Sequence, residues 1–441
     1  MWCSRSFLAV LLCLISLDLV ADCPAPRTSL PAPAAATLSD DDATWAPGEL
    51  TAAPWPEPGP AEDWMDVVTG DPEIPHARRL LQIYTLPVGA GNCQLMLCPN
   101  QNRMIMFDCG ALPFDKVGWN KADVSAFIAN LINPNTSISV SISHTHYDHN
   151  SYLPDVLANR RISTIVMSDT PQNYPANVRN WMRNAYNQGT RVLWKSGIYR
   201  SQAPEPPLSC YKPEPTGGWS IDVQGYVVMM NAGANPNDAS MVIAQRYGRF
   251  QTVFTGDMTG ETEQRIDNNL PVPLNQTTVI TGAHHGSDSH DSNNPSWAIA
   301  NQAEAVMFSA GGLFWHPRCA AAQTYRPYLL QFPRAHNFQC GRDHHWARGP
   351  TRLAAYSTNI NGAIRVRADA NGRWDIGARL NALDDLNAIA LESLKRADLM
   401  PGPDTLYGDS QVPNTATPDI DPAPETNCGD PPPEDKAHRP H

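Results

Sequence analysis

Apolar positions in the central part of the chain follow two periodicities. Short runs rich in β-branched residues predict strands, and stretches with apolar residues three or four positions apart predict helices. The predicted strands are residues 80–86, 94–98, 104–107, 137–143, 164–167, 226–230, 241–245, 252–255, 278–281 and 305–309. The predicted helices are residues 121–131, 151–158, 177–187 and 297–301. Hairpin-like strand pairs mixed with helices favour an α/β fold in which helices cover two sheets.

This pattern is confined to residues 79–400, which predict one large domain. Residues 1–21 combine a basic start, a short apolar run and a small residue at position 21, which predicts a secretory signal peptide. Residues 22–78 are expected to form a Pro/Ala-rich acidic linker, with eleven acidic and two basic residues. Residues 401–441, with eight acidic and two basic residues, are expected to be a Pro-rich acidic disordered tail.

The charge of the chain therefore lies mainly in its flanks. The whole sequence has a net charge of −12, but the 79–400 block has a charge of about +3 and excludes no anionic substrate. Lys and Arg are not clustered with aromatic residues along the chain, so no stable nucleic-acid complex is expected. No apolar run reaches the ~20 residues of a membrane span, so no membrane anchor is expected. With the signal peptide, this predicts a secreted protein.

Cysteine usage agrees with export. Eight cysteines remain once the signal segment is removed, and an even number in a secreted chain favours disulfides. None of them forms a Cys-x-x-Cys pair, which argues against a zinc site made of thiolates. We expect a disulfide between Cys319 and Cys340.

The strongest chemical signal is the sequence HTHYDH at residues 144–149, which directly follows the predicted strand 137–143. Three imidazoles and a carboxylate on a loop leaving a strand suit zinc, with manganese or iron as alternatives. His144 and His146 would reach one ion. Asp148 and His149, on the far side of the turn, would reach a second ion a few ångströms away.

Further motifs follow in a recognisable order. They are LPVGAGN at 86–92, MFDCG at 106–110, NDASMVI at 237–243, VFTGDM at 253–258, AHHGS at 283–287, FWHP at 314–317 and STNINGAIRV at 357–366. Together with HxHxDH they resemble the metallo-β-lactamase superfamily over residues 80–370. The resemblance is closest to the hydrolase domain of competence (ComEC-type) DNA-uptake channels and its stand-alone relatives. It implies a four-layer αββα metallo-β-lactamase sandwich with two mixed sheets.

The resemblance also implies the remaining ligands. Asp257 would be the carboxylate that bridges two divalent ions, and His284 or His285 would complete the second ion's shell. We favour His284 because it lies nearer the end of the predicted strand 278–281. No histidine lies between residues 149 and 257, where many superfamily members have another ligand. The first ion would then have three protein ligands and an open position, which is the arrangement of catalytic sites.

Two other residues are candidates for direct catalytic roles. Asn237 would bind substrate or support a ligand, although a plain turn role is equally compatible with the sequence. His316, before Pro317, would bind a phosphate or protonate a leaving oxygen, and a packing role is the alternative. Asn150 and the two residues after it replace the family's Ile-Gly-Gly. This change leaves the ligands intact, but it weakens the inference that this chain shares the family's substrate.

These features predict a secreted binuclear metal-dependent hydrolase. Two ions would make hydroxide available by lowering the pKa of a bridging water, and Asp148 would orient that water. The competence-type resemblance implies a phosphodiesterase or nuclease-type activity. Two alternatives stay open. One is hydrolysis of a small-molecule carbonyl substrate such as a lactam, lactone or thioester, and the other is a non-catalytic secreted binding module.

Overall fold

The computed structural model describes residues 65–68 and 80–379, apart from residues 116, 196, 234 and 267–269. All of these residues belong to one compact unit, Trp45–His441. The predicted signal peptide and acidic tail lie outside the described residues. Most of the predicted linker does too, but four of its residues form a strand, Met65–Val68.

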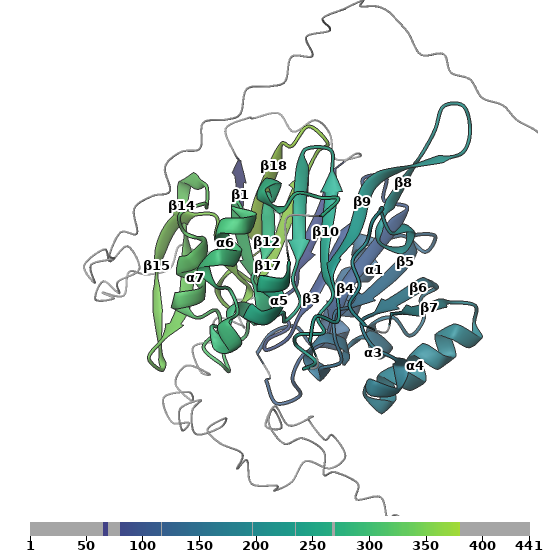
Figure 1. Cartoon of the computed structure of the whole chain (residues 1–441), viewed down its shortest axis with the longest axis horizontal. Coiled ribbons are helices and arrows are strands. Elements are labelled where there is room, and N and C mark those ends of the chain that lie inside the picture. Colours follow the sequence, from purple (N-terminus) through teal and green to yellow (C-terminus); the bar gives the residue numbers. More distant parts are fainter. Residues whose placement is uncertain are drawn as a thin grey trace, which may run out of the picture. The chain divides into compact units, whose positions relative to one another are not determined.

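Within the described residues the strands form two large mixed sheets and a hairpin (Figure 1). The first sheet runs β1 (Met65–Val68), β18 (Trp374–Arg379), β17 (Ala363–Ala368), β2 (Leu81–Thr85), β3 (Cys93–Leu97), β4 (Arg103–Cys109), β5 (Ser137–Ile142), β6 (Ile162–Met167) and β7 (Arg191–Trp194). The second runs β16 (Ala355–Ser357), β13 (Ala305–Phe308), β12 (Val279–Thr281), β11 (Phe250–Phe254), β10 (Val242–Tyr247), β9 (Trp219–Met229) and β8 (Cys210–Pro213). The hairpin pairs β14 (Gln331–Arg342) with β15 (His345–Leu353).

Helices cover the outer faces of both sheets. The first sheet carries α1 (Lys121–Leu131), α3 (Leu153–Val156) and α4 (Ala176–Asn187), and the second carries α5 (Gly260–Arg265), α6 (Pro295–Asn301) and α7 (Cys319–Tyr325). The described helices also include the short α2 (Tyr147–Asn150) and α8 (Thr358–Asn361). The apolar face of α1 buries Val124 and Ile128, and its start is fixed by a capping box between Asn120 and Asp123.

A continuous apolar core lies between the two sheets. Phe107 of β4 stacks on Phe254 of β11 with ring centroids 3.9 Å apart, and Ile83 and Ile243 are buried in the same cluster. Each sheet thus buries one face against the other sheet and the opposite face against helices. The fold is therefore a metallo-β-lactamase-like αββα sandwich with two mixed sheets, which confirms the predicted fold class.

The direction of the strands determines where a site can form. β4, β5, β6 and β7 are parallel, and α1, α3 and α4 lie in their crossover connections. The carboxyl ends of these strands therefore meet at one edge of the first sheet. The loops at that edge face the carboxyl ends of β11 and β12, which are also parallel to each other.

Three disulfides join the described cysteines. Cys93–Cys109 links the neighbouring strands β3 and β4, and Cys98–Cys210 links the first sheet to β8 of the second. Cys319–Cys340, which joins α7 to the β14–β15 hairpin, confirms the predicted pair. Cys23 and Cys428 lie outside the described residues. Among the described helices, none has the length and apolar character needed to cross a bilayer.

Candidate metal centre

The first sheet supplies the motif residues 144–149, which leave the carboxyl end of β5 and turn at once into α2. Asn150, the last residue of α2, holds this turn. Its side-chain amide donates hydrogen bonds to the carbonyl oxygens of Thr145 (3.1 Å) and His146 (2.6 Å). The residue that departs from the family pattern therefore stabilises the loop that carries the ligands.

The second sheet supplies the facing ligands. Asp257 follows β11 after Gly256, whose φ of 56° lies in the left-handed region that favours glycine. A Cβ on Gly256 would lie 2.8 Å from the Ser143 side chain, so the close approach of the two sheets also requires glycine. His284 and His285 lie in the tight turn that follows β12.

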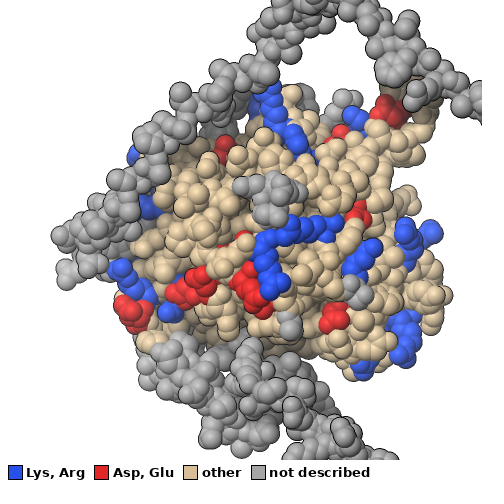
Figure 2. Space-filling view, in the orientation of Figure 1, with Lys and Arg blue, Asp and Glu red and all other residues tan. Residues whose placement is uncertain are grey.

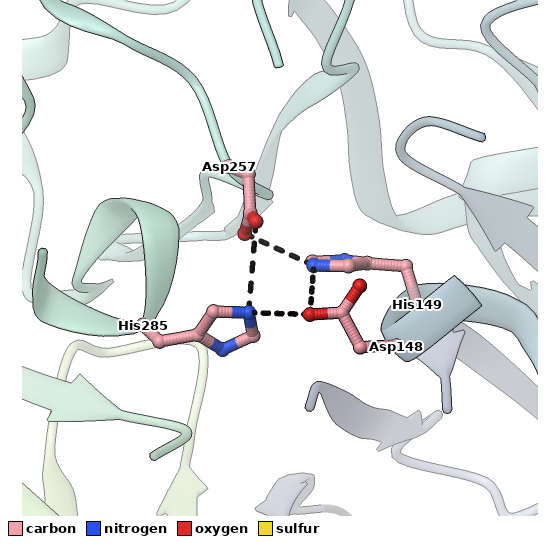
Figure 3. A group of neighbouring side chains, drawn as sticks. All are labelled: Asp148, His149, Asp257 and His285. Carbon is pink, nitrogen blue, oxygen red and sulfur yellow. Dashed lines mark ion pairs between the residues drawn. The ribbon is translucent and has the colours of Figure 1, made fainter. Parts of the chain in front are cut away.

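Four side chains from the two sheets point their polar ends at one another (Figure 3). His149 Nε2 lies 3.0 Å from Asp257 Oδ1. His285 Nε2 lies 3.3 Å from Asp148 Oδ2 and 3.5 Å from Asp257 Oδ2. The ligand atoms of all four residues lie within 4.8 Å of one another. Two imidazoles and two carboxylates in this arrangement suit a divalent ion such as zinc, manganese or iron.

A second group shares one residue with the first. The ligand atoms of His144, His146 and Asp257 also lie within 4.8 Å of one another. His144 is fully buried, and its Nε2 lies 3.9 Å from Asp257 Oδ2. Asp257 is therefore placed to contact two ions at once, and the His144 group has only three protein ligands. That geometry is typical of a two-ion site with a position open to water or substrate.

The tandem histidines differ in position, and the preference for His284 does not match the geometry. His285 belongs to the four-residue group, whereas His284 belongs to neither group. Both residues have left-handed backbone conformations, with φ of 50° and 58°, so nearness to the strand end does not determine which ring faces the carboxylates. His285 Nδ1 donates to the carbonyl oxygen of Ser309 (2.8 Å), which directs Nε2 toward Asp148 and Asp257.

The surroundings of the two ring nitrogens in each histidine show whether these residues fit metal ions. Nε2 of His144, His149 and His285 is buried in each case. For His149 and His285 this nitrogen faces the carboxylates of Asp257 and Asp148, and for His144 it has no hydrogen-bond partner among the described residues. The opposite nitrogen of each ring is held by an oxygen. It is Ser143 Oγ for His144 (3.0 Å), Asp108 Oδ2 for His149 (2.8 Å) and a backbone carbonyl for His285. Rings fixed through Nδ1, with Nε2 directed at the carboxylates of a shared cluster, are the usual form of metal-ligating histidines, so the residues fit two ions.

Asp108 was not singled out from the sequence, although it lies in the MFDCG motif. It is the penultimate residue of β4, and both of its carboxylate oxygens are used. Oδ1 accepts from Ser143 N (2.6 Å), while Oδ2 accepts from Ser143 Oγ (2.7 Å), Asn92 Nδ2 (3.1 Å) and His149 Nδ1. Asp108 therefore positions the His149 ring and the start of the motif loop together.

Replacing Asp108 by Asn should weaken metal binding. The neutral amide is a poorer partner for His149 Nδ1, and loss of such a partner typically costs about 10- to 100-fold in metal affinity. Calorimetric titration of the metal-free protein with Zn²⁺ measures the change. Asp155→Asn, an exposed carboxylate in α3, is the matched control. Equal affinities in Asp108→Asn and the wild type would contradict this role.

The carboxylates and imidazoles of the centre shift one another's pKa values, so that the carboxylates stay ionised and His149 stays protonated when no cation is bound. Although burial opposes ionisation, the imidazoles of His149, His285 and His284 lower the pKa of Asp257 well below its usual value. Burial also opposes a charge on His149, yet the carboxylates of Asp257 and Asp108 raise its pKa well above the usual value. A cation must therefore displace a proton from His149, and metal affinity should fall as the pH falls.

Two other predicted residues border the cluster without joining it. Asn237 is 3% exposed, and its side chain interacts with the ring of His146, whose pKa is lowered mainly by burial. The His316 ring lies 6.3 Å from that of His284 and 6.4 Å from that of His285, measured between centroids. His316 belongs to neither ligand group, and its ring lies beside those of the tandem histidines.

The described residues thus combine a metallo-β-lactamase-like sandwich fold with a candidate binuclear metal centre. No protein-family model and no curated protein matches the sequence. Among solved structures the chain is similar to a mutant of the CmlA beta-hydroxylase, with 11% identity and a TM-score of 0.37 over 67% of this chain and 54% of that chain. It is also similar to a peroxy diiron species of the chemotaxis sensor ODP, with 13% identity and a TM-score of 0.23 over 40% and 60%. The chain thus spans little more than half the length of either structure.

Proposed function

We propose that this chain is a secreted, binuclear metal-dependent hydrolase that cleaves phosphodiesters. The observation that carries the proposal is that Asp257 belongs to both His/Asp groups, each of which combines residues from the two sheets. Two divalent ions bound there would supply a water of lowered pKa and offset the charge of an anionic ester. Zinc is the proposed metal, because the ligand set is imidazole and carboxylate.

We assign the remaining catalytic roles to three residues near the ligand groups. The Asp148 side chain is 16% exposed, more than that of Asp257 at 4%, so Asp148 is the carboxylate that solvent reaches. We assign it the role of orienting the attacking water. The His316 ring lies beside the tandem histidines and would hydrogen-bond the leaving oxygen. Asn237 would hold the orientation of His146.

Hydrogen-bond donors on the His316 side would bind the oxygens of an anionic substrate. Burial lowers the pKa of His284 to about 4 and that of His316 well below its usual value, so both imidazoles are neutral donors. Arg318 follows His316 by two residues, and its Nε lies 3.5 Å from the exposed Asp288 carboxylate. The ring of His284, which belongs to neither ligand group, lies beside His316. A guanidinium and two further imidazoles next to the ligands provide hydrogen-bond donors for phosphate oxygens.

A substrate panel tests the proposal. The metal-loaded full chain is assayed with bis(p-nitrophenyl) phosphate, with the lactam nitrocefin and with a lactone, each beside the metal-free protein. Metal-dependent release of p-nitrophenol alone is the expected result. Turnover of nitrocefin or the lactone without phosphodiester cleavage would overturn it in favour of a carbonyl substrate. Metal binding with no turnover of any compound would favour a binding module.

Export is tested separately. We expect the native host to release the protein into the medium with a mature N-terminus after residue 21, as read by mass spectrometry of its first peptide. An intact N-terminal segment on protein retained inside cells would contradict secretion.

A further inference from the structure

The turn that carries the tandem histidines is held by one buried side chain from the segment after it. Asn293 is 1% exposed, and its Nδ2 donates to the carbonyl oxygens of Ala283 and Ser287, both at 2.8 Å. Its Oδ1 accepts from Ala283 N (2.9 Å). The Asn293 amide therefore bonds both ends of the turn that contains His284 and His285.

The conformation of this turn needs such support. His284 and His285 both have left-handed backbone conformations, which residues with a β carbon adopt only at a cost in energy. Consecutive residues of this kind persist where the surrounding contacts fix them. The direction of the His285 ring thus depends on two supports, the Ser309 carbonyl at Nδ1 and Asn293 at the backbone.

Asn293 is itself fixed by two helices. Its backbone N–H donates to Glu263 Oε1 of α5 (2.6 Å), and the Tyr325 hydroxyl of α7 donates to its Oδ1 (2.9 Å). Glu263 is 4% exposed, whereas Figure 2 shows charged side chains on the outer surface where Figure 1 places α5. Both donor and both acceptor positions of the Asn293 amide are therefore used, which leaves it a single orientation.

The same segment also contacts the loop of the bridging candidate, Asp257. Ser292 Oγ donates to the carbonyl oxygen of Met258 (3.1 Å), and both residues are buried. Met258 directly follows Asp257 in the chain. Ser292 and Asn293 thus join the two loops of the second sheet that carry candidate ligands.

We propose that Asn293 is a positioning residue of the metal centre. It holds the turn so that His285 Nε2 is directed at Asp148 and Asp257. It acts through the backbone on either side of the tandem histidines rather than as a ligand. This inference rests on the metal-binding part of the proposed function and is independent of the substrate.

Asn293→Asp tests the proposal with the smallest change of shape. Aspartate also tolerates the left-handed φ of 59° at this position, and it keeps the two acceptor bonds. When ionised, the oxygen that replaces Nδ2 cannot donate to Ala283 and Ser287. Calorimetric titration of the metal-free full chain with Zn²⁺ should show the ion of the His285 group bound about tenfold more weakly. The ion of the His144 group should keep most of its affinity.

The sign of this effect distinguishes position from charge. An added carboxylate would by charge alone strengthen the binding of a cation, so weaker binding reports a displaced imidazole. The visible absorption spectrum of the Co²⁺-loaded chain should change with it, because the spectrum depends on the ligand geometry. Tyr325→Phe removes one hydrogen bond from Asn293 Oδ1 and keeps the ring, so it should weaken the same ion by a smaller factor. Unchanged zinc affinities in both variants would overturn the proposal.

Asn301 provides a matched control at the far end of α6. It is fully buried, and its side chain also donates and accepts, to the Trp297 carbonyl oxygen (2.6 Å) and from Ala303 N (3.1 Å). Asn301→Asp should lower the melting temperature of the metal-free chain about as much as Asn293→Asp. It should leave both zinc affinities and the Co²⁺ spectrum unchanged. The same loss of affinity in both variants would mean that Asn293 has only a general structural role.

Hydrogen exchange separates this inference from the proposed function. Ser287 N donates to the His284 carbonyl oxygen within the turn (2.7 Å), and in the metal-free chain this N–H should exchange faster in Asn293→Asp than in the wild type or Asn301→Asp. If no variant binds zinc but this pattern holds, the proposed function fails and the positioning of the turn stands. If two ions bind equally well to Asn293→Asp and the wild type, the positioning role fails alone.

Discussion

Asp257→Ala is expected to lose both the metal ions and the proposed hydrolytic activity. Asp257 is the one residue common to the two ligand groups, so its removal leaves only His144 and His146 on one side and three ligands on the other. Elemental analysis should fall from about two ions per chain to fewer than one. Phosphodiester cleavage should fall at least about a thousandfold, because water without two ions keeps a high pKa.

Asp155→Ala removes a carboxylate from the exposed face of α3 and serves as the control for the loss of charge. It should bind two ions and keep full activity. Circular dichroism of both variants checks that they fold. If Asp257→Ala is folded and still binds two ions, Asp257 is not the bridging ligand and the binuclear assignment is wrong.

The tandem histidines should respond differently to the same substitution. His285→Ala removes a ring whose Nε2 faces both Asp148 and Asp257, so the ion held with His149 should bind at least about 100-fold more weakly. Activity should fall with it. His284→Ala removes a ring that belongs to neither ligand group, so two ions should remain.

Metal content after dialysis against a weak chelator measures this difference, and a thermal melt with and without Zn²⁺ gives an independent readout. Zn²⁺ should raise the melting temperature of His284→Ala as in the wild type and that of His285→Ala much less. The reverse order would restore His284 as the ligand and place His285 on the substrate side.

The parts of the fold that local sequence determines were predictable. Helix α1 has the predicted bounds, because its capping residues and apolar spacing lie within the helix itself. The β14–β15 hairpin was not predicted, because its sequence contains Pro333 and several exposed charges. Its stability comes from distant contacts, namely the Cys319–Cys340 disulfide and the packing of Trp346 against Trp315.

Strand β1 also could not be predicted from local sequence. It lies within the predicted linker, and its four residues pair with β18, about three hundred positions later in the chain. No local periodicity marks Met65–Val68 as a strand, since a short edge strand depends on its partner.

The candidate site was predictable where its residues are contiguous. The HxHxDH motif contributes four candidate ligands from six neighbouring positions, so spacing alone indicates its chemistry. The choice between His284 and His285 depends on a left-handed turn, which the sequence does not specify. The role of Asp108 depends on the parallel pairing of β4 with β5, which brings it beside Ser143 and His149.

The Cys98–Cys210 disulfide links the two sheets covalently at a position away from the candidate ligands. Cys98 lies beyond the end of β3 opposite to Cys93, whose partner Cys109 directly follows Asp108. The two sheets are thus joined by a covalent bond at one place and would be joined by shared ions at another. Loss of the ions would leave the disulfide and the apolar core as the links between the sheets, so chelation and reduction together should lower the free energy of unfolding more than either does alone.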